Sequence, residues 1–192
     1  MSDAGKDAAA LVATPSQTVG PFFHFALTPN GSEGPVQPVA GTAPVQLVVR
    51  VTDGEGQAVT DAIVEIWQGV DSPAGAAGQS AGNAICGFAR LPTGEDGECT
   101  FETVRPGLLP DGSGGQAAPH INVCLFARGL LRQLHTRIYF ADDPSLDGDA
   151  VLAFVPEERR TTLLARADPA RDGRWLFHLR LQGADETVFF DV

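Results

Sequence analysis

The sequence predicts an all-β domain, either a sandwich or a barrel. Turn-forming residues are abundant, with 22 glycines and 14 prolines among 192 residues, and they gather between short runs of β-forming residues. Seven such short runs are separated by Gly, Pro and Asp residues, which is typical of a sandwich or barrel and not of βαβ units. Apolar residues at 43% and charged residues at 19% suffice for a hydrophobic core and exclude a disordered chain.

The first expected strand, residues 45–51, precedes an Asp-Gly-Glu-Gly turn that is typical of a hairpin. One helix is expected from residue 156 to about residue 165. Proline opens this segment, two glutamates lie at its positive end, and three arginines follow. The expected strands are residues 45–51, 62–67, 98–104, 120–127, 136–140, 175–181 and 187–192.

Three segments lack a regular pattern. Residues 71–83 and residues 110–119 contain few large apolar side chains, so both are expected to be long loops. Neither is a phosphate-binding loop, because no Gly-Lys-Ser/Thr follows the glycines and no helix begins there. Residues 1–44 are interpreted as an N-terminal arm and residues 45–192 as a single β-domain. Because the arm contains a compact aromatic run at 18–24, we expect it to pack on another surface, such as a second chain.

The charge balance excludes several partners and compartments. With 13 Lys and Arg against 24 Asp and Glu, the formal charge is −11 and the isoelectric point is near 4.6, which argues against nucleic acid and anionic lipid. The sequence has neither a membrane-spanning apolar run nor a secretory signal, so a cytoplasmic location is expected. The three cysteines form no Cys-x-x-Cys pair and are interpreted as reduced thiols.

The expected strand at 120–127 has the most informative pattern. Alternation places Ile121, Val123 and Leu125 in the core, and the opposite face carries His120, Asn122, Cys124, Phe126 and, if the strand continues, Arg128. That face is either the wall of a site or a half-solvated strand surface. Asn122 is a weak ligand for a transition metal, and no Gly-x-Ser-x-Gly elbow indicates a hydrolase. Trp67 is expected in the core.

Several segments resemble, in order along the chain, the landmarks of the intradiol ring-cleavage dioxygenases. The resemblance covers the chain after about residue 11 and implies a β-sandwich of mixed sheets with functional loops at one edge, to which the residues themselves add the one short helix. The segments are TPSQTVGP at 14–21, DAIVEIWQ at 61–68, TVRPG at 103–107, APHIN at 118–122, the run 120–129, TRIYF at 136–140 and the tail 181–191.

The resemblance also implies that the family's metal site is vestigial here. In that family a ferric ion is held by two tyrosines and two histidines, because phenolate oxygens suit Fe(III). This chain has one tyrosine, Tyr139, which does not match either ligand position. Leu109 stands at one tyrosine position, the other would fall in 71–83, and His120 and Asn122 stand where the family has His-x-His. We therefore expect no iron to be bound by this chain.

A heteromeric member of the family is the best match. It implies αβ pairs in a higher hetero-oligomer, with Fe(III) on a homologous β chain and this chain lining the substrate cavity. The implied reaction cleaves 3,4-dihydroxybenzoate with O₂ between the hydroxyl-bearing carbons, giving 3-carboxy-cis,cis-muconate. Thr18, Gly20 and Pro21 would form cavity wall, and Arg128 would pair with the aromatic acid through its bidentate fork.

Three alternatives stay open. Arg128 can be a surface cation at a strand end without contact to substrate. The chain can be a homomeric catechol-type intradiol dioxygenase, against which the single tyrosine weighs. It can also be a non-catalytic β-sandwich that serves as a binding or scaffold module.

Overall fold

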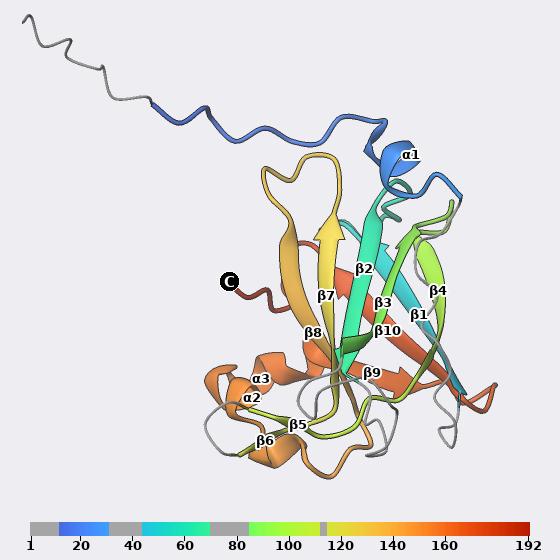
Figure 1. Ribbon diagram of the computed structural model, residues 1–192, viewed down its shortest axis with the longest axis vertical. Coiled ribbons are helices and arrows are strands. Elements are labelled where there is room, and N and C mark those ends of the chain that lie inside the picture. The colour runs from blue at the N-terminus through green and yellow to red at the C-terminus, as the bar shows by residue number, and fades with distance from the viewer. Residues whose placement is uncertain (1–11, 31–43, 70–84, 112–114) are drawn as a thin grey trace, which may run out of the picture.

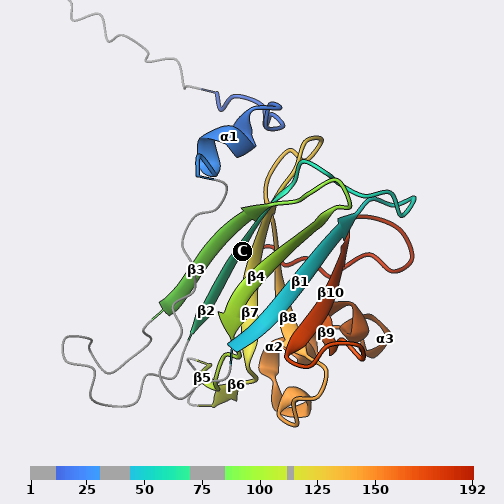
Figure 2. The same ribbon diagram turned by 90° about the vertical axis from the view of Figure 1, so that its right-hand side faces the viewer.

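The chain folds into two layers of β-strands that face each other across one core, as the computed structural model shows (Figures 1 and 2). The structure describes residues 12–30, 44–69, 85–111 and 115–192. The expected all-β sandwich is confirmed. One layer contains β3 (Ile85–Pro92), β2 (Ile63–Gly69), β7 (His120–Phe126) and β8 (Leu134–Phe140), and the other contains β10 (Arg174–Arg180), β1 (Pro44–Thr52) and β4 (Glu98–Val104).

The short strand β9 (Leu164–Ala167) joins the two layers into one sheet. The order of the eight strands is β3-β2-β7-β8-β9-β10-β1-β4. β9 pairs in parallel with β8 at Tyr139 and Leu164, and antiparallel with β10 at Trp175 and Ala167. β1 and β10 are also parallel, so the sheet is mixed as expected. The sandwich is therefore a single sheet folded over at β9.

The helix expected from 156 to about 165 is shorter than predicted. It consists of α3 (Glu157–Arg160) and one turn of 3₁₀ helix, η2 (Thr161–Leu163), and the chain then enters β9. Ala165 is fully buried, and its carbonyl accepts a hydrogen bond from the amide of Ala141 at 3.0 Å. Pairing with two neighbouring strands therefore outweighs the weak helical preference of the segment.

Alternating side chains from both layers form the core. Ile121, Val123 and Leu125 all lie in it, which confirms the inward face predicted for this strand. Each aliphatic side chain that is fully buried contributes about 2 kcal/mol to folding. The core positions of the other strands include Leu47, Val49, Val51, Val64, Ile66, Phe101, Ile138, Phe140, Trp175, Phe177 and Leu179.

Two predictions about strands were wrong. Residues 187–192 form no strand but a tail, which is held by an isolated bridge between His135 and Phe190 and by hydrogen bonds of Val188 to Thr136 and Thr162. Strand β3 was missed, because its inward positions include the small residues Gly87 and Ala89, which produce a weak hydrophobic signal. The prediction that Trp67 is a core residue was also wrong. It is 40% exposed on the outer face of β2, and its ring packs at a tilt against Phe88 of β3.

The remaining elements are short. A two-stranded pair, β5 (Leu109–Pro110) and β6 (Gln116–Ala117), overlaps the expected loop at 110–119 and begins one residue before it. η1 (Leu146–Gly148) and α2 (Ala150–Phe154) lie with α3 at the end of the sandwich where β7 begins (Figure 1). The expected loop at 71–83 lies outside the described residues. None of the helices in the described ranges has the length and apolar character needed to span a membrane.

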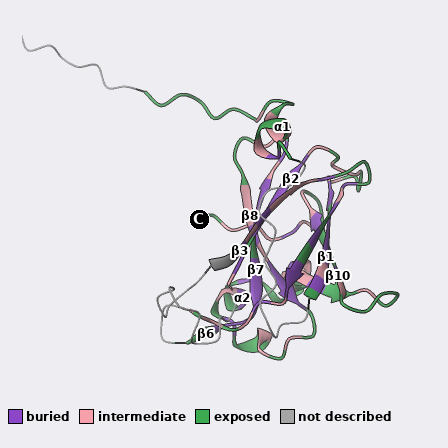
Figure 3. Cartoon of the chain, turned by 45° about the vertical axis from the view of Figure 1, so that its right-hand side comes forward, coloured by how far each residue is buried: buried purple, intermediate pink, exposed green. Residues whose placement is uncertain are grey.

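The described part of the arm lies at the opposite end of the sandwich, where β7 finishes (Figure 1). It includes the short helix α1 (Phe23–Leu27), whose last carbonyl accepts a hydrogen bond from the Arg90 guanidinium at 3.0 Å. Most residues of the described part, 12–30, are exposed, as the green trace in Figure 3 shows. The rings of Phe22 and Phe25 are 74% and 64% exposed. The single chain therefore leaves the aromatic part of the arm largely uncovered.

Candidate functional site

The predicted site residues fall in two separate places. His120 begins β7, and Arg128 lies two residues beyond the end of that strand. Seven extended residues span roughly 20 Å at about 3.4 Å per residue, so the two side chains are at opposite ends of the sandwich. Thr18 lies at the Arg128 end. The structure therefore separates the candidate metal position from the candidate carboxylate-binding position.

His120 is buried on the outer side of β7. Its Nδ1 is 2.8 Å from the carbonyl oxygen of Ala118, which can only accept, so Nδ1 carries the proton and donates. The His120 ring lies beside Tyr139, with the ring centroids 5.6 Å apart. Burial lowers the pKa of His120 below its ordinary value, and the positive charge of Arg137 lowers it further, whereas the Ala118 bond opposes the shift. His120 is therefore a neutral imidazole at neutral pH.

The single tyrosine has a structural role. The fully buried Tyr139 hydroxyl donates to Oδ1 of Asp149 at 3.1 Å and lies 3.4 Å from Nη1 of Arg137. Asp149 also caps α2 by accepting from two backbone amides, and its Oδ2 accepts from the Ala118 amide at 2.9 Å. Burial raises the pKa of Tyr139 to about 12. The phenol therefore stays protonated and connects β8 to the cap of α2.

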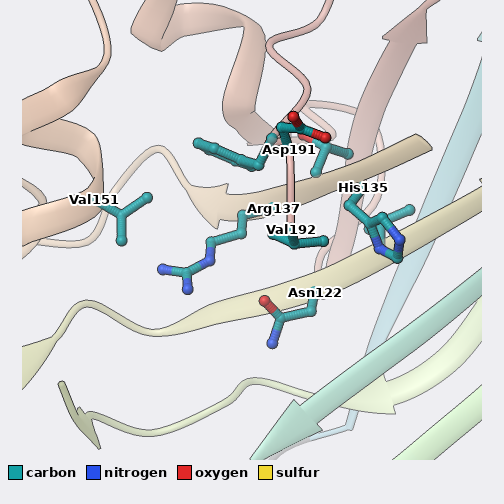
Figure 4. Close-up of a pocket in the computed structure, with 9 residues that line it drawn as sticks. Asn122, His135, Arg137, Val151, Asp191 and Val192 are labelled. Carbon is teal, nitrogen blue, oxygen red and sulfur yellow. The ribbon is translucent and has the colours of Figure 1, made fainter. Parts of the chain in front are cut away.

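Asn122 faces a cavity of about 430 Å³ next to the C-terminal tail (Figure 4). Its register partner on β8 is Arg137, and both side chains line this cavity. His135, Val151 and Phe190 are among the other lining residues. Leu109 lies in β5 against the end of β2, where a Cβ added to Gly69 would come within 2.6 Å of the leucine side chain. The Leu109 side chain therefore packs closely against the backbone at the end of β2.

These residues do not fit a ferric ion. Leucine has no donor atom, an asparagine amide is a weak neutral ligand, and the Tyr139 phenol is held protonated by its pKa. In the ranges that the structure describes, no three His, Cys, Asp or Glu side chains are grouped so that they could hold a metal. The two-phenolate site that the resemblance implies cannot be built from the one tyrosine of the sequence.

Arg128 lies in the loop that joins β7 to β8, and not on a continued strand as the alternation argument allowed. Its Nε forms an ion pair with Oδ2 of Asp61. The arginine side chain is 56% exposed and the aspartate side chain 23% exposed. The next residue, Gly129, has a φ of +87°, a backbone conformation that glycine adopts without strain. The loop therefore presents the Arg128 guanidinium at the surface, with its Nε held by Asp61.

The arm reaches the same loop through Thr18. Its Oγ1 accepts a hydrogen bond from the amide of Gly129 at 2.7 Å. Gly20 accepts from the amide of Phe23 at 3.3 Å, and Pro21 follows as an exposed residue at the turn into α1. The structure thus brings Thr18 next to Arg128, whereas Gly20 and Pro21 face solvent in the single chain.

Two residues, one in each of these places, were not identified from the sequence. Asp61 belongs to a motif that was noticed but received no role, and its contact with Arg128 depends on how β2 and β7 pair. Arg137 lines the cavity beside Asn122. It was missed because the alternation of β8 does not show that β7 is the neighbouring strand or that Asn122 is the residue opposite.

Comparisons with known proteins agree on one family. A family model described as Dioxygenase matches residues 34–183. A protocatechuate 3,4-dioxygenase alpha chain of Burkholderia cepacia is 41% identical, over 95% of this chain and 98% of that protein. The alpha chain of Pseudomonas putida is 36% identical, over 94% of this chain and 97% of that protein. A beta chain of Burkholderia cepacia is 32% identical, over 72% of this chain and 64% of that protein.

Solved structures share the fold. The dioxygenase domain of a dioxygenase and carbohydrate-binding fusion protein from Streptomyces sp. SirexAA-E has a TM-score of 0.54 and is 27% identical, covering 89% of this chain and 99% of that chain. Catechol 1,2-dioxygenase from Pseudomonas arvilla C-1 has a TM-score of 0.54 at 22% identity, covering 84% of this chain and 66% of that chain, which shows the likeness of fold alone.

Proposed function

This chain belongs to the dioxygenase family whose model spans most of it, and we propose that it is the non-iron-binding α subunit of a heteromeric protocatechuate 3,4-dioxygenase. Enzymes of the intradiol family use iron. Relatives named alpha chain and beta chain both match this sequence, which supports an assembly of two homologous chains. In the proposal, the β chain ligates Fe(III), this chain ligates no metal, and αβ pairs associate into a higher hetero-oligomer.

The observation that carries the proposal is the distance between Arg128 and the vestigial metal position. The two lie at opposite ends of β7, so Arg128 and the arm cannot serve a reaction centre at His120 of the same chain. They lie instead on an exposed end of the sandwich, together with the uncovered rings of Phe22 and Phe25 in and just before α1. In the proposal this end closes over the iron site of the β chain, and residues 1–44 are the arm that packs on that chain.

The chemistry of the loop suits an aromatic acid. Protocatechuate is an anion, and a chain with a formal charge of −11 repels it unless a local cation offsets the field. Arg128 supplies that cation and a planar pair of donors for a carboxylate. Thr18, Gly20 and Pro21 form the neighbouring cavity wall in the assembled enzyme. The product of cleavage between the two hydroxyl-bearing carbons is 3-carboxy-cis,cis-muconate.

The proposal is tested by co-expression with a β chain, followed by measurement of bound iron and of oxygen uptake with protocatechuate. Removing one partner of a partly desolvated charge pair costs about 2–5 kcal/mol, so Arg128→Ala should lower kcat/KM by roughly 30- to 5,000-fold with the iron content unchanged. Arg132→Ala is the matched control, because Arg132 lies in the same loop, is 75% exposed and pairs only loosely with Asp191 at 3.4 Å.

The same measurements test the alternatives. Stoichiometric iron and full activity in this chain alone would establish a homomeric enzyme. If Arg128→Ala and Arg132→Ala leave turnover equally unaffected in an assembled complex, this chain is a scaffold rather than part of the cavity. We also propose a cytoplasmic location, which the free thiols of Cys99 and Cys124 support.

A further inference from the structure

We propose that Asp61 is a positioning residue for the substrate, acting through Arg128. The inference rests on the proposed role of Arg128 and extends it by naming the group that orients the guanidinium. It is carried by the ion pair between Nε of Arg128 and Oδ2 of Asp61, and by the donors that this pair leaves free.

The register of the sheet places the two residues opposite each other. β2 and β7 are antiparallel, and Ile63 pairs with Phe126 at the end of the ladder. Continuing that register by two residues on each strand puts Asp61 across from Arg128. Opposite positions of an antiparallel pair hold their side chains within reach of each other. The two residues therefore lie just past the last paired positions of β2 and β7, and their contact continues the order of that ladder into the flanking turns.

The backbone that carries Asp61 is firmly held. The next residue, Ala62, is fully buried, and its amide donates to the hydroxyl of Thr93 at 3.0 Å. The amide of Thr93 returns a bond to the Ala62 carbonyl at 2.9 Å, and its hydroxyl also donates to the Val59 carbonyl at 2.7 Å. On the other side of the pair, Ala127 is 1% exposed. Each residue of the ion pair thus adjoins a buried alanine, and the Asp61 side is also tied down by the hydrogen bonds of Thr93.

The ion pair leaves the two terminal Nη groups of the Arg128 guanidinium free to bind a carboxylate. An arginine has five N–H donors, and its two terminal Nη groups match the two oxygens of a carboxylate. Asp61 engages Nε, and within the described ranges no other acceptor contacts Arg128. The bound aspartate also restricts a side chain that would otherwise have many rotamers. Asp61 therefore presents the terminal edge of Arg128 in one direction, ready for the acid group of the substrate.

The experiment uses the complex assembled with a β chain, and two substrates. Asp61→Asn should raise KM for protocatechuate by about 3- to 10-fold, the cost of immobilising one long side chain on binding. The steady-state constants for catechol, which has no carboxylate, should not change, and neither should Tm, because a partly exposed ion pair adds little stability. The matched control is Asp142→Asn, which removes an exposed ion pair with Arg105 at the other end of β8.

A double-mutant cycle separates this inference from the proposed function. If Asp61 acts through Arg128, then Asp61→Asn should have no further effect on KM in the Arg128→Ala background. Additive effects of the two substitutions would overturn the inference, and so would an unchanged or lower KM for protocatechuate in Asp61→Asn alone. If Arg128→Ala itself leaves KM for protocatechuate unchanged, the proposed role of Arg128 fails, and the inference about Asp61 fails with it.

Discussion

The hydroxyl oxygen of Thr18 accepts a hydrogen bond from the backbone amide of Gly129 at 2.7 Å, although the two residues are 111 positions apart in the sequence. The bond joins the N-terminal arm to the loop that follows β7, directly beside Arg128. The arm and the loop therefore lie together at one edge of the sandwich. In the proposed enzyme, both parts of the cavity wall supplied by this chain meet at this contact.

Removing the Thr18 hydroxyl should weaken the cavity wall without weakening the domain. Thr18→Val keeps the shape of the side chain but cannot accept the Gly129 amide, and the loss of one hydrogen bond corresponds to about 1 kcal/mol. We expect kcat/KM for protocatechuate to fall about fivefold in the assembled complex, with Tm unchanged. Thr14→Val is the control, since Thr14 is equally exposed. Equal effects of both substitutions would assign no role to the Thr18 contact.

Tyr139 should not be needed for iron binding by the assembled complex. Its hydroxyl donates to the Asp149 carboxylate, and burial raises its pKa to about 12, so it is not a phenolate ligand. Tyr139→Phe in the assembled complex should leave the iron content and the visible absorption of the ferric centre unchanged, while folding stability falls by about 1 kcal/mol. Metal analysis and the absorption spectrum check this. Loss of iron or of the visible band would show that this phenol binds the metal.

The carboxylate of Asp149 should be among the most costly polar groups to remove. It is 2% exposed and accepts hydrogen bonds from the amides of Ala118, Val151 and Leu152 as well as from the Tyr139 hydroxyl. Asp149→Ala removes the cap of α2 and leaves buried donors unsatisfied, for a cost of about 3 kcal/mol. Asp149→Asn keeps one acceptor oxygen and should cost less. Urea unfolding of both variants checks the order, and equal losses would contradict this account.

The local patterns of the sequence predict the sandwich well where a strand alternates large apolar residues, as Ile121, Val123 and Leu125 do in β7. They fail for β3, where small residues occupy inward positions, and for β9, where sheet pairing converts the end of an expected helix into a strand. The site is predicted less completely, because the contacts of Asp61 and Thr18 with the Arg128 loop depend on register and on chain segments far apart in sequence. Neither relation is encoded in a local motif.

The thiols of Cys99 and Cys124 should be unreactive in the folded protein. Burial raises the pKa of each to about 12, so almost no thiolate is present at pH 8. In a Cys86→Ser variant, maleimide should leave this chain unmodified under native conditions and should add two labels after denaturation, as mass spectrometry of the chain would show. Labelling of either cysteine without unfolding would contradict the burial of its thiol.

The stability of the fold should fall in mild acid because of His120. Burial holds the pKa of the folded-state imidazole below its ordinary value near 6.5, with Arg137 lowering it further, so the unfolded chain binds the proton more readily. Above about pH 6.5 the imidazole is neutral in both states and imposes no penalty. As the pH falls from there toward the folded-state pKa, protonation of the unfolded state lowers the free energy of unfolding by up to about 1.4 kcal/mol per pH unit.

His120→Gln removes this titration, so its free energy of unfolding should depend less on pH between 5 and 7 than that of the unmodified protein. His178→Gln is the control. The pKa of His178 is lowered in the same direction by burial and by Arg50 and Arg180, but its side chain is exposed, so the change in slope should be smaller. Urea unfolding at pH 5, 6, 7 and 8 measures all three slopes. A His120→Gln slope equal to that of the unmodified protein would mean that the imidazole is not kept neutral by its burial against Tyr139 and Ala118.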